Sequence, residues 1–294
     1  MPELPDIVVY QECLERKIAG ARLLRARVND PFLLRTAAVP VAAADGERVR
    51  SIGRLGKRIV IGLENEVFLV LHLMIAGRLH WRERPFGAKD RSTLAAFEFA
   101  HGHLALTESG SRRRASLHVV RGNAALAALD PGGVDVLAIA LEPFVARLRS
   151  VNHTLKRALT DPHLFSGIGN AYSDEILHRA RLSPFVQTAQ LADGDALRLY
   201  DAARATLTEW IDRLRAEAKV DWPPRVSAFR PAMAVHGRYG KPCPVCQAPV
   251  QRIVYAENET NYCARCQTGG KVLADRSLSR LLKSSWPRSI DELG

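Results

Sequence analysis

The sequence predicts an α+β protein: a helix followed by a β-sandwich, then a helical region, then a small zinc-binding hairpin. Three observations lead to this fold class. Between residues 22 and 120, short apolar or alternating runs are separated by turn residues, which is typical of a sandwich or barrel. Between residues 142 and 217, apolar residues recur with helical spacing. Near the C-terminus, four cysteines form two Cys-x2-Cys pairs.

The N-terminal part is expected to begin with a helix over residues 6–18, which carry one apolar stripe and are followed by Gly20. The chain then changes to the two-residue periodicity of strands. The clearest predicted strands are 58–63, 67–73, 93–99 and 103–107.

A turn cluster at residues 130–133 separates this part from the helical one. Helices are predicted at 142–149, 152–160, 172–180 and 195–217, and Trp222-Pro223-Pro224 ends the last of them. We therefore expect four parts: a sandwich domain over 1–133, a helical domain over 134–235, a zinc hairpin over 236–270 and a basic tail over 271–294.

The overall charge favours a polyanionic partner. The 294 residues include 42 Lys and Arg against 31 Asp and Glu, which gives a net charge of +11 and a pI near 9.8. Nucleic acid is the obvious polyanion, although a basic soluble protein without such a partner stays an alternative. The sequence shows no apolar run of membrane-spanning length and no signal peptide, so we expect no membrane association and a cytoplasmic protein.

The cysteine spacing predicts a structural zinc site. Sixteen residues separate the two Cys-x2-Cys pairs, an interval that suits a β-hairpin between two metal knuckles. Four thiolates close the tetrahedral coordination of one Zn²⁺ and leave no position for a substrate. Unrelated buried cysteines and a redox pair are the alternatives. Cys13 stands apart and is expected to be a packing residue. The predicted ligands are Cys243, Cys246, Cys263 and Cys266.

The first three residues, Met1-Pro2-Glu3, hold a possible nucleophile. Removal of the initiator methionine leaves a secondary amine on Pro2, next to a carboxylate. An α-amino group titrates near pH ~8, so part of it is unprotonated at neutral pH and can attack an electrophilic sugar carbon to form an iminium. The alternative is that Pro2 and Pro5 only stiffen the N-terminus.

Two further features are compatible with phosphate binding. Residues 166–170, Ser-Gly-Ile-Gly-Asn, lead into a predicted helix, where backbone N–H groups suit a phosphate and Asn170 could cap the helix or contact that phosphate. Lys57 stands at the start of a strand and could bind a phosphate. Taken singly, most such turns are only turns, and most such lysines are solvated charges.

Together these motifs resemble the formamidopyrimidine-DNA glycosylase and endonuclease VIII family. Met1 to Pro5 is similar to the start of these enzymes, and Lys57 falls at the place of their sandwich lysine. Residues 152–175 resemble their helix–two-turn–helix motif, and 235–243 their entry into the zinc hairpin. The resemblance spans residues 1 to about 267 with the motifs in the family's order.

The resemblance implies a bilobal DNA glycosylase with abasic-site lyase activity, which removes damaged, oxidised bases in base-excision repair from a flipped nucleotide. It implies that Pro2 attacks C1′, that Glu3 handles protons at the deoxyribose, and that Lys57 belongs to the same catalytic group. It further implies that Glu175 supports the active site. The implied DNA-binding positions are Lys156, Asn170, Tyr239 and Asn258.

The sequence departs from the family at positions that contact DNA. Asn258 replaces an arginine, and residues 72–75 read His-Leu-Met-Ile where purine-specific members have His-Leu-Gly-Met. The segment 108–115, Glu-Ser-Gly-Ser-Arg-Arg-Arg-Ala, lacks the family's wedge phenylalanine. The candidates for filling the gap left by a flipped base are Met74, Ile75 and Arg113.

The expected partner is damaged DNA, as a duplex or at abasic, open or single-stranded sites. We expect a monomer, associated with the nucleoid if the source is bacterial. The departures from the family at residues 72–75, 108–115 and 258 leave a second interpretation open. In this interpretation the chain is a non-catalytic, zinc-containing protein that binds damaged or distorted DNA.

Overall fold

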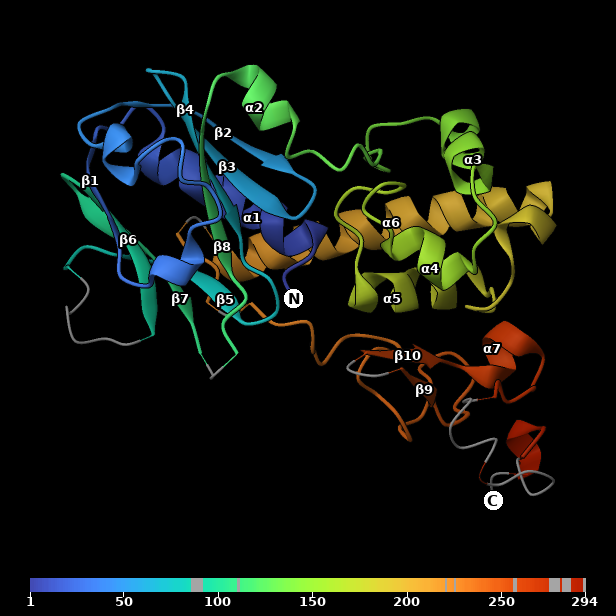
Figure 1. The fold of residues 1–294 in the computed structure, drawn as a ribbon. Coiled ribbons are helices and arrows are strands. Elements are labelled where there is room, and N and C mark those ends of the chain that lie inside the picture. The colour runs from blue at the N-terminus through green and yellow to red at the C-terminus, as the bar shows by residue number, and fades with distance from the viewer. Residues whose placement is uncertain are drawn as a thin grey trace. The chain divides into compact units, whose positions relative to one another are not determined.

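The computed structural model describes the chain except for residues 86–91, 110–111, 220, 225, 256–257, 275–280, 282–286 and 293–294. The chain forms two compact units (Figure 1). Unit 1 comprises Met1–Pro131 and Trp210–Ser227, and unit 2 comprises Gly132–Glu209 and Ala228–Gly294. The long helix α6 (Asp193–Ala218) contributes residues to both units.

Unit 1 contains two four-stranded antiparallel sheets. The first has the strand order β1 (Leu23–Val28), β6 (Thr93–Phe99), β7 (Gly102–Glu108), β5 (Gly77–Arg82). The second has the order β2 (Val49–Leu55), β3 (Arg58–Leu63), β4 (Val67–His72), β8 (Ser116–Arg121). The four strands predicted from sequence are present within one residue of their expected ends.

The two sheets share one apolar core, which α1 (Leu4–Ile18) and residues of both sheets fill. On the other face of the second sheet, Phe68 and Val70 pack near Leu126 of the short helix α2 (Asn123–Ala127). Both faces of β3 and β4 are therefore covered, which explains why their sequences are almost continuously apolar. α1 begins at Leu4, two residues earlier than predicted, because Pro5 fits the first turn of a helix, where no N–H is needed.

The strand register brings two connections together at one end of unit 1. Gly77 lies opposite Glu108, and His72 lies opposite Ser116. The β4–β5 turn (residues 73–76) and the β7–β8 loop (residues 109–115) therefore connect neighbouring strand ends. The 3-10 helix η1 (Pro31–Leu33) reaches the same end, since Leu34 forms a parallel bridge with Leu117. We call these three segments the turn cluster of unit 1.

Unit 2 begins with the helices α3 (Leu141–Arg149), α4 (Leu155–Thr160) and α5 (Asn170–Ala180). The aromatic rings of Phe144, Phe165 and Tyr200 pack together, with Phe144 5.0 Å and 5.4 Å from the other two centroids. α4 starts three residues later than predicted because Thr154 caps it, accepting a hydrogen bond from the backbone N–H of Arg157.

The zinc hairpin consists of β9 (Gln251–Tyr255), β10 (Asn258–Tyr262) and α7 (Ala264–Thr268). The described part of the C-terminal tail folds back onto it: Lys271 forms an antiparallel bridge with Ser289. Ile290, in the 3-10 helix η5 (Ile290–Glu292), is buried in the same apolar cluster as Val235 and Tyr262. The described end of the tail is thus part of the hairpin's core.

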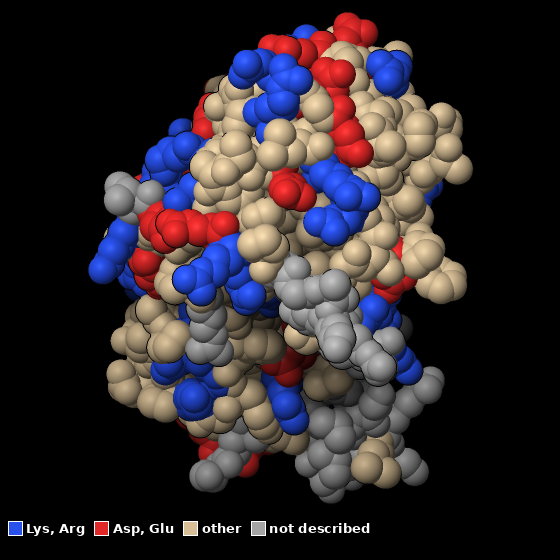
Figure 2. Space-filling model, turned by 90° about the vertical axis from the view of Figure 1, so that its left-hand side faces the viewer, with Lys and Arg blue, Asp and Glu red and all other residues tan. Residues whose placement is uncertain are grey.

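These elements confirm the predicted α+β fold class. Among the described residues, no helix is long and apolar enough to cross a membrane. Lys and Arg side chains are spread over the face shown in Figure 2 with Asp and Glu between them. Among the residues described on that face, the positive side chains are therefore interspersed with negative ones.

Candidate active site and zinc centre

The N-terminus of unit 1 gathers several charged groups. Pro2 is buried, and Glu3 and Asp6 are 2% and 3% exposed. The Asp6 carboxylate accepts a hydrogen bond from the backbone N–H of Glu3 at 3.0 Å, which fixes Glu3 at the start of α1. The terminal amine here belongs to Met1, one residue ahead of the Pro2 nitrogen. Burial lowers the pKa of this amine, and the negative charge of Glu3 opposes that shift.

Lys57 lies close enough to this group for its charge to interact with Glu3. It stands in the turn between β2 and β3, after Gly56, whose φ of +59° fits the left-handed region. Burial lowers the pKa of the Lys57 amine, and Glu3 partly offsets this effect. Lys57 is half-buried, which disfavours the alternative interpretation of a solvated surface lysine. The structure brings the predicted residues Pro2, Glu3 and Lys57 into one region of unit 1.

Sequence reasoning did not single out two residues near this region, Arg78 and His72. Arg78 interacts electrostatically with the terminal amine, and its guanidinium donates to the carbonyl oxygens of Ile75 and Gly77 at 3.1 Å and 2.6 Å. The positive charge of Arg78 therefore disfavours the protonated amine and lowers its pKa, while its hydrogen bonds hold the β4–β5 turn. Burial, followed by the charges of Arg58 and Lys57, lowers the pKa of His72 to about 4. His72 does have a sequence signal, because it is the first residue of the 72–75 segment that resembles the family's His-Leu-Gly-Met, whereas Arg78 has none beyond being basic and within a strand.

The three candidates for filling a base gap all lie in the turn cluster. Ile75 is 52% exposed, and Met74 has a φ of +50°, in the left-handed region. Arg113 forms an ion pair with Asp30 at 3.0 Å. Glu108, which is buried, accepts hydrogen bonds from the backbone N–H groups of residues 114 and 115 at 2.9 Å and so closes the β7–β8 loop.

In unit 2, Lys156 is held inside the helix–two-turn–helix region. Its ammonium donates to Asp174 Oδ1 and to the carbonyl oxygen of Asn170, both at 2.6 Å. The other carboxylate oxygen of Asp174 lies 2.8 Å from His236 Nδ1. The Lys156 ammonium is mostly buried and is already bonded to two residues of α5. This favours a role in positioning α5 over the predicted contact with a DNA phosphate. Asp174 and His236 were missed from sequence, because nothing there shows that they are buried partners.

Glu175 and Asn170 connect α5 to other parts of unit 2. The Glu175 carboxylate accepts hydrogen bonds from the backbone N–H groups of Ala234, Val235 and His236 at 2.7–2.9 Å. Burial nevertheless raises its pKa. The Asn170 amide donates to the carbonyl oxygen of Glu259 in β10 at 2.8 Å. The expectation that Asn170 could cap α5 was wrong: Gly169 is the capping residue, and Asn170 is the first residue of the helix.

Two predicted DNA-binding positions lie in or beside the zinc hairpin. Tyr239 is 52% exposed, and the Arg252 guanidinium stacks on its ring, 4.3 Å from the centroid. Arg252 also approaches Glu259 at 3.8 Å. Asn258 begins β10 and pairs with Tyr255 in the ladder, and its side chain lies outside the described part of the structure.

The four predicted metal ligands come together around the hairpin. Their Sγ atoms all lie within 4.8 Å of one another, and two of the pairs are 3.4 Å and 3.9 Å apart. Zn–S bonds of about 2.3 Å at tetrahedral angles place neighbouring sulfurs about 3.8 Å apart, so the donor set fits Zn²⁺. His178 of α5 lies 3.3 Å from Cys243 Sγ. These four cysteines form a structural zinc site.

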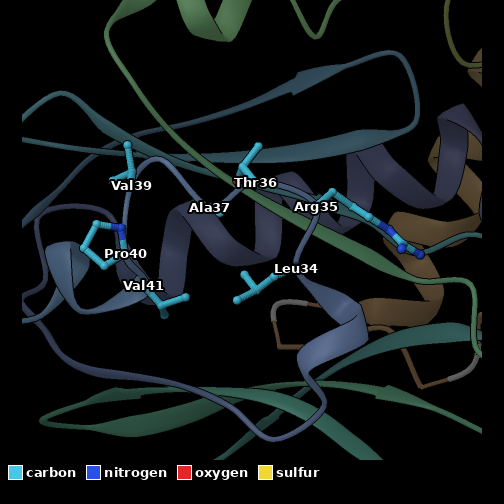
Figure 3. Close-up of a pocket in the computed structure, with 7 residues that line it drawn as sticks. All are labelled: Leu34, Arg35, Thr36, Ala37, Val39, Pro40 and Val41. Carbon is cyan, nitrogen blue, oxygen red and sulfur yellow. The ribbon is translucent and has the colours of Figure 1, made fainter.

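A separate pocket of about 370 Å³ lies beside η1 and is lined by residues 34–37 and 39–41 (Figure 3). The Arg35 side chain points away from the hollow, which leaves mainly Leu34, Val39, Pro40 and Val41 around it. None of the predicted site residues lines this pocket.

Comparisons with known proteins match this arrangement along the chain. Residues 1–117 match the family model of the formamidopyrimidine-DNA glycosylase N-terminal domain, and 133–219 match its H2TH domain. Residues 240–269 match a zinc finger found in FPG and IleRS. The formamidopyrimidine-DNA glycosylase of Thermus thermophilus is 32% identical over 280 residues, which cover 92% of this chain and all of the relative. The chain belongs to the formamidopyrimidine-DNA glycosylase family.

The fold agrees with solved structures of this family. The crystal structure of the MutM (Fpg) protein from Thermus thermophilus is 33% identical, covers 90% of this chain and 98% of its own, and superposes with a TM-score of 0.76. A complex of Lactococcus lactis Fpg with DNA containing an abasic site has a TM-score of 0.79 at 23% identity, over 90% of this chain and 99% of its own.

A formamidopyrimidine-DNA glycosylase-like protein from Mycobacterium tuberculosis, described as uncharacterized, is 38% identical over 151 residues. These residues are 51% of this chain and 94% of that protein. The family match in the hairpin ends at residue 269, so the tail that folds back onto the hairpin extends beyond it.

Proposed function

We propose that this protein is a bifunctional DNA glycosylase and abasic-site lyase that removes damaged, oxidised bases in base-excision repair. Its family membership and the name of the Thermus relative support the glycosylase class and damaged DNA as the partner. The observation that carries the proposal is the buried N-terminus, where Glu3 and Lys57 interact electrostatically with the terminal amine.

Removal of Met1 would transfer the terminal amine to Pro2. The Pro2 nitrogen then attacks C1′ of the damaged nucleoside, and the bond from C1′ to the base breaks, so that the base leaves with the bonding electron pair and takes up a proton from water. Glu3 accepts the proton of the Pro2 nitrogen and delivers it to the ring oxygen. The bond between C1′ and the ring oxygen breaks, the sugar opens, and an iminium forms between C1′ and Pro2. Loss of a C2′ proton from the iminium expels the 3′ phosphate, which cleaves the strand by β-elimination.

The environment of the amine supports this role. Only an unprotonated amine is nucleophilic, and burial lowers the pKa of the Met1 amine. Because Pro2 is itself buried, we expect burial to act in the same direction on a Pro2 amine and to leave a larger fraction of it unprotonated at neutral pH. Lys57 adds positive charge near Glu3, where a sugar phosphate would bring negative charge.

Unit 2 is proposed to hold the DNA backbone. Asn170 lies at the N-terminus of an eleven-residue helix, where the backbone N–H groups favour an anion. Tyr239 is exposed beside Arg252, whose charge suits a phosphate. Glu175 is proposed to support the active site by fixing the backbone at residues 234–236. Because both units belong to one chain, a monomer suffices, and such an enzyme would act at chromosomal DNA in the cytoplasm.

Asn258 leads to a proposal about substrate preference. An arginine offers a fixed charge and a bidentate fork to phosphate, whereas asparagine offers a neutral amide on a shorter stem. Extruding a nucleotide costs a few kcal/mol in an intact pair and least at an abasic site or in a single strand. We therefore expect a preference for sites that are already open. In single-turnover cleavage of abasic DNA, Asn258→Arg should gain selectively on duplex over single-stranded substrate.

The second candidate function is a zinc-containing protein that binds damaged DNA without catalysis. The absence of an arginine at position 258 and the altered 108–115 segment favour it. Borohydride trapping on DNA with an abasic site separates the two functions, because only an amine that forms an iminium is reduced to a covalent adduct. An adduct supports the lyase, and tight binding without any adduct supports the binder.

A further inference from the structure

Phe32 is an unusually exposed aromatic residue for a position so firmly held. Its side chain is 83% exposed, while Leu33 beside it is 2% exposed and belongs to the core of unit 1. Pro31 starts the 3-10 helix η1, and the backbone N–H of residue 35 donates to the carbonyl oxygen of Leu117 at 3.0 Å. The backbone on both sides of Phe32 is thus fixed while its ring stands in solvent.

One carboxylate joins Phe32 to the β7–β8 loop. Asp30 Oδ1 accepts a hydrogen bond from the backbone N–H of Phe32 at 3.0 Å. Asp30 Oδ2 accepts one from Arg113 Nη1, also at 3.0 Å. Asp30 therefore sets the orientation of the η1 turn and of the Arg113 guanidinium at the same time.

The residues around Phe32 include both cationic and apolar side chains, which suit the phosphates and the bases of nucleic acid, respectively. The β7–β8 loop carries three consecutive exposed arginines, Arg112 to Arg114, and no aromatic residue. By the strand register, this loop lies beside the β4–β5 turn, where Ile75 is 52% exposed. Arginines neutralise phosphates, and an aromatic ring among them offers a face on which a base stacks.

We propose that Phe32 is the base-stacking residue of this protein and contacts the bases next to the gap from which the damaged nucleotide has been extruded. This inference rests on the proposed function. A ring on a fixed turn loses little conformational freedom on binding, so its stacking free energy is retained. Stacking is tolerant of sequence because every base has a π-face, and it is strongest where a neighbouring base is missing and the face is open.

The test compares binding of two duplexes, one intact and one with a non-cleavable tetrahydrofuran abasic site, at a fixed salt concentration. Phe32→Ala should weaken binding to the abasic duplex by about tenfold and leave binding to the intact duplex within about twofold. Phe32→Trp, which keeps an aromatic face, should retain wild-type preference. Leu24→Ala is the matched control, since Leu24 is an exposed apolar residue of β1 in the same unit.

Each outcome decides one statement. If wild type prefers the abasic duplex and Phe32→Ala binds both duplexes as tightly as wild type, the proposed role of Phe32 is wrong and the proposed function is unaffected. An equal loss on both duplexes also overturns it, because Phe32 would then be a general contact. Wild type without any preference for the abasic duplex contradicts the proposed function, and the inference fails with it.

Discussion

Lys156 and Asp174 form a buried ion pair in which the ammonium lies 2.6 Å from the carboxylate oxygen. The lysine side chain is 11% exposed, and the aspartate side chain is fully buried. The pair joins α4 to α5, and Asp174 extends the network to His236. Removing one partner of such a pair leaves an uncompensated charge in the interior.

Lys156→Met should therefore lower the free energy of unfolding by about 3–5 kcal/mol. Lys17→Met is a matched control, because Lys17 pairs with Asp221 at 2.7 Å but the aspartate is 74% exposed, and such a surface pair is worth about 0–1 kcal/mol. Chemical denaturation measures both. A similar decrease in the free energy of unfolding for the two variants would show that the buried pair stabilises the fold no more than the surface pair does.

Salt dependence separates the two roles of Lys156. If the ammonium only positions α5, the slope of log K against log salt for duplex DNA stays unchanged in a Lys156 variant that is still folded. A phosphate contact would instead flatten the slope by about 0.9. The geometry of the ion pair predicts the unchanged slope.

Loss of one zinc ligand should affect the hairpin and spare the sandwich. Zinc supplies about 10 kcal/mol or more of folding free energy in small zinc modules, so Cys263→Ser should release the metal and weaken DNA binding. Cys13→Ser is the control, because Cys13 is buried in unit 1 and is not a ligand. Metal analysis should find one zinc per chain in wild type and in Cys13→Ser. Full zinc content in Cys263→Ser would exclude this residue as a ligand.

His72 should make stability depend on pH. Its pKa is about 4 in the folded protein and about 6.5 in the unfolded chain, so between these values the unfolded state binds the extra proton. The contribution of the neutral His72 side chain to the free energy of unfolding is complete above pH ~6.5 and is lost as the pH falls toward ~4. When the pH is lowered from ~7 to ~5, the free energy of unfolding should fall by about 1–2 kcal/mol more in wild type than in His72→Gln. Parallel stability curves for the two proteins would contradict this.

Met74 should carry backbone strain. Its φ of +50° lies in the left-handed region, which costs a residue with a side chain about 1 kcal/mol and costs glycine almost nothing. Met74→Gly is therefore expected to raise the melting temperature by a few degrees. Ile75→Gly, one residue along, gains no such relief and serves as the control. A lower melting temperature for Met74→Gly would mean that its side-chain contacts outweigh the strain.

Local patterns predicted much of the fold. The apolar runs of β3 and β4, the helical spacing of α5 and α6, and the cysteine spacing all depend on residues close in sequence, and each element is present. Helix ends were less well predicted. Thr154 caps α4 with its side-chain hydroxyl, and the extended backbone of Gly169 precedes α5, and periodicity reveals neither.

The parts of the site that sequence missed depend on contacts across long stretches of chain. Asp174 meets His236 across 62 residues, and Arg113 meets Asp30 across 83. A buried histidine and an exposed one look the same in sequence, and so do a paired and an unpaired arginine. Phe32 likewise has the sequence context of an ordinary core residue, and only its 83% exposure distinguishes it.

Mass spectrometry of the borohydride-trapped adduct identifies the nucleophile. Protein is trapped on abasic-site DNA, digested, and the modified residue located. We expect that Met1 is absent, that the adduct lies on the Pro2 nitrogen, and that an uncleaved N-terminal tag abolishes trapping while DNA binding persists. An adduct on Lys57 or another lysine, or undiminished trapping by the tagged protein, would contradict it.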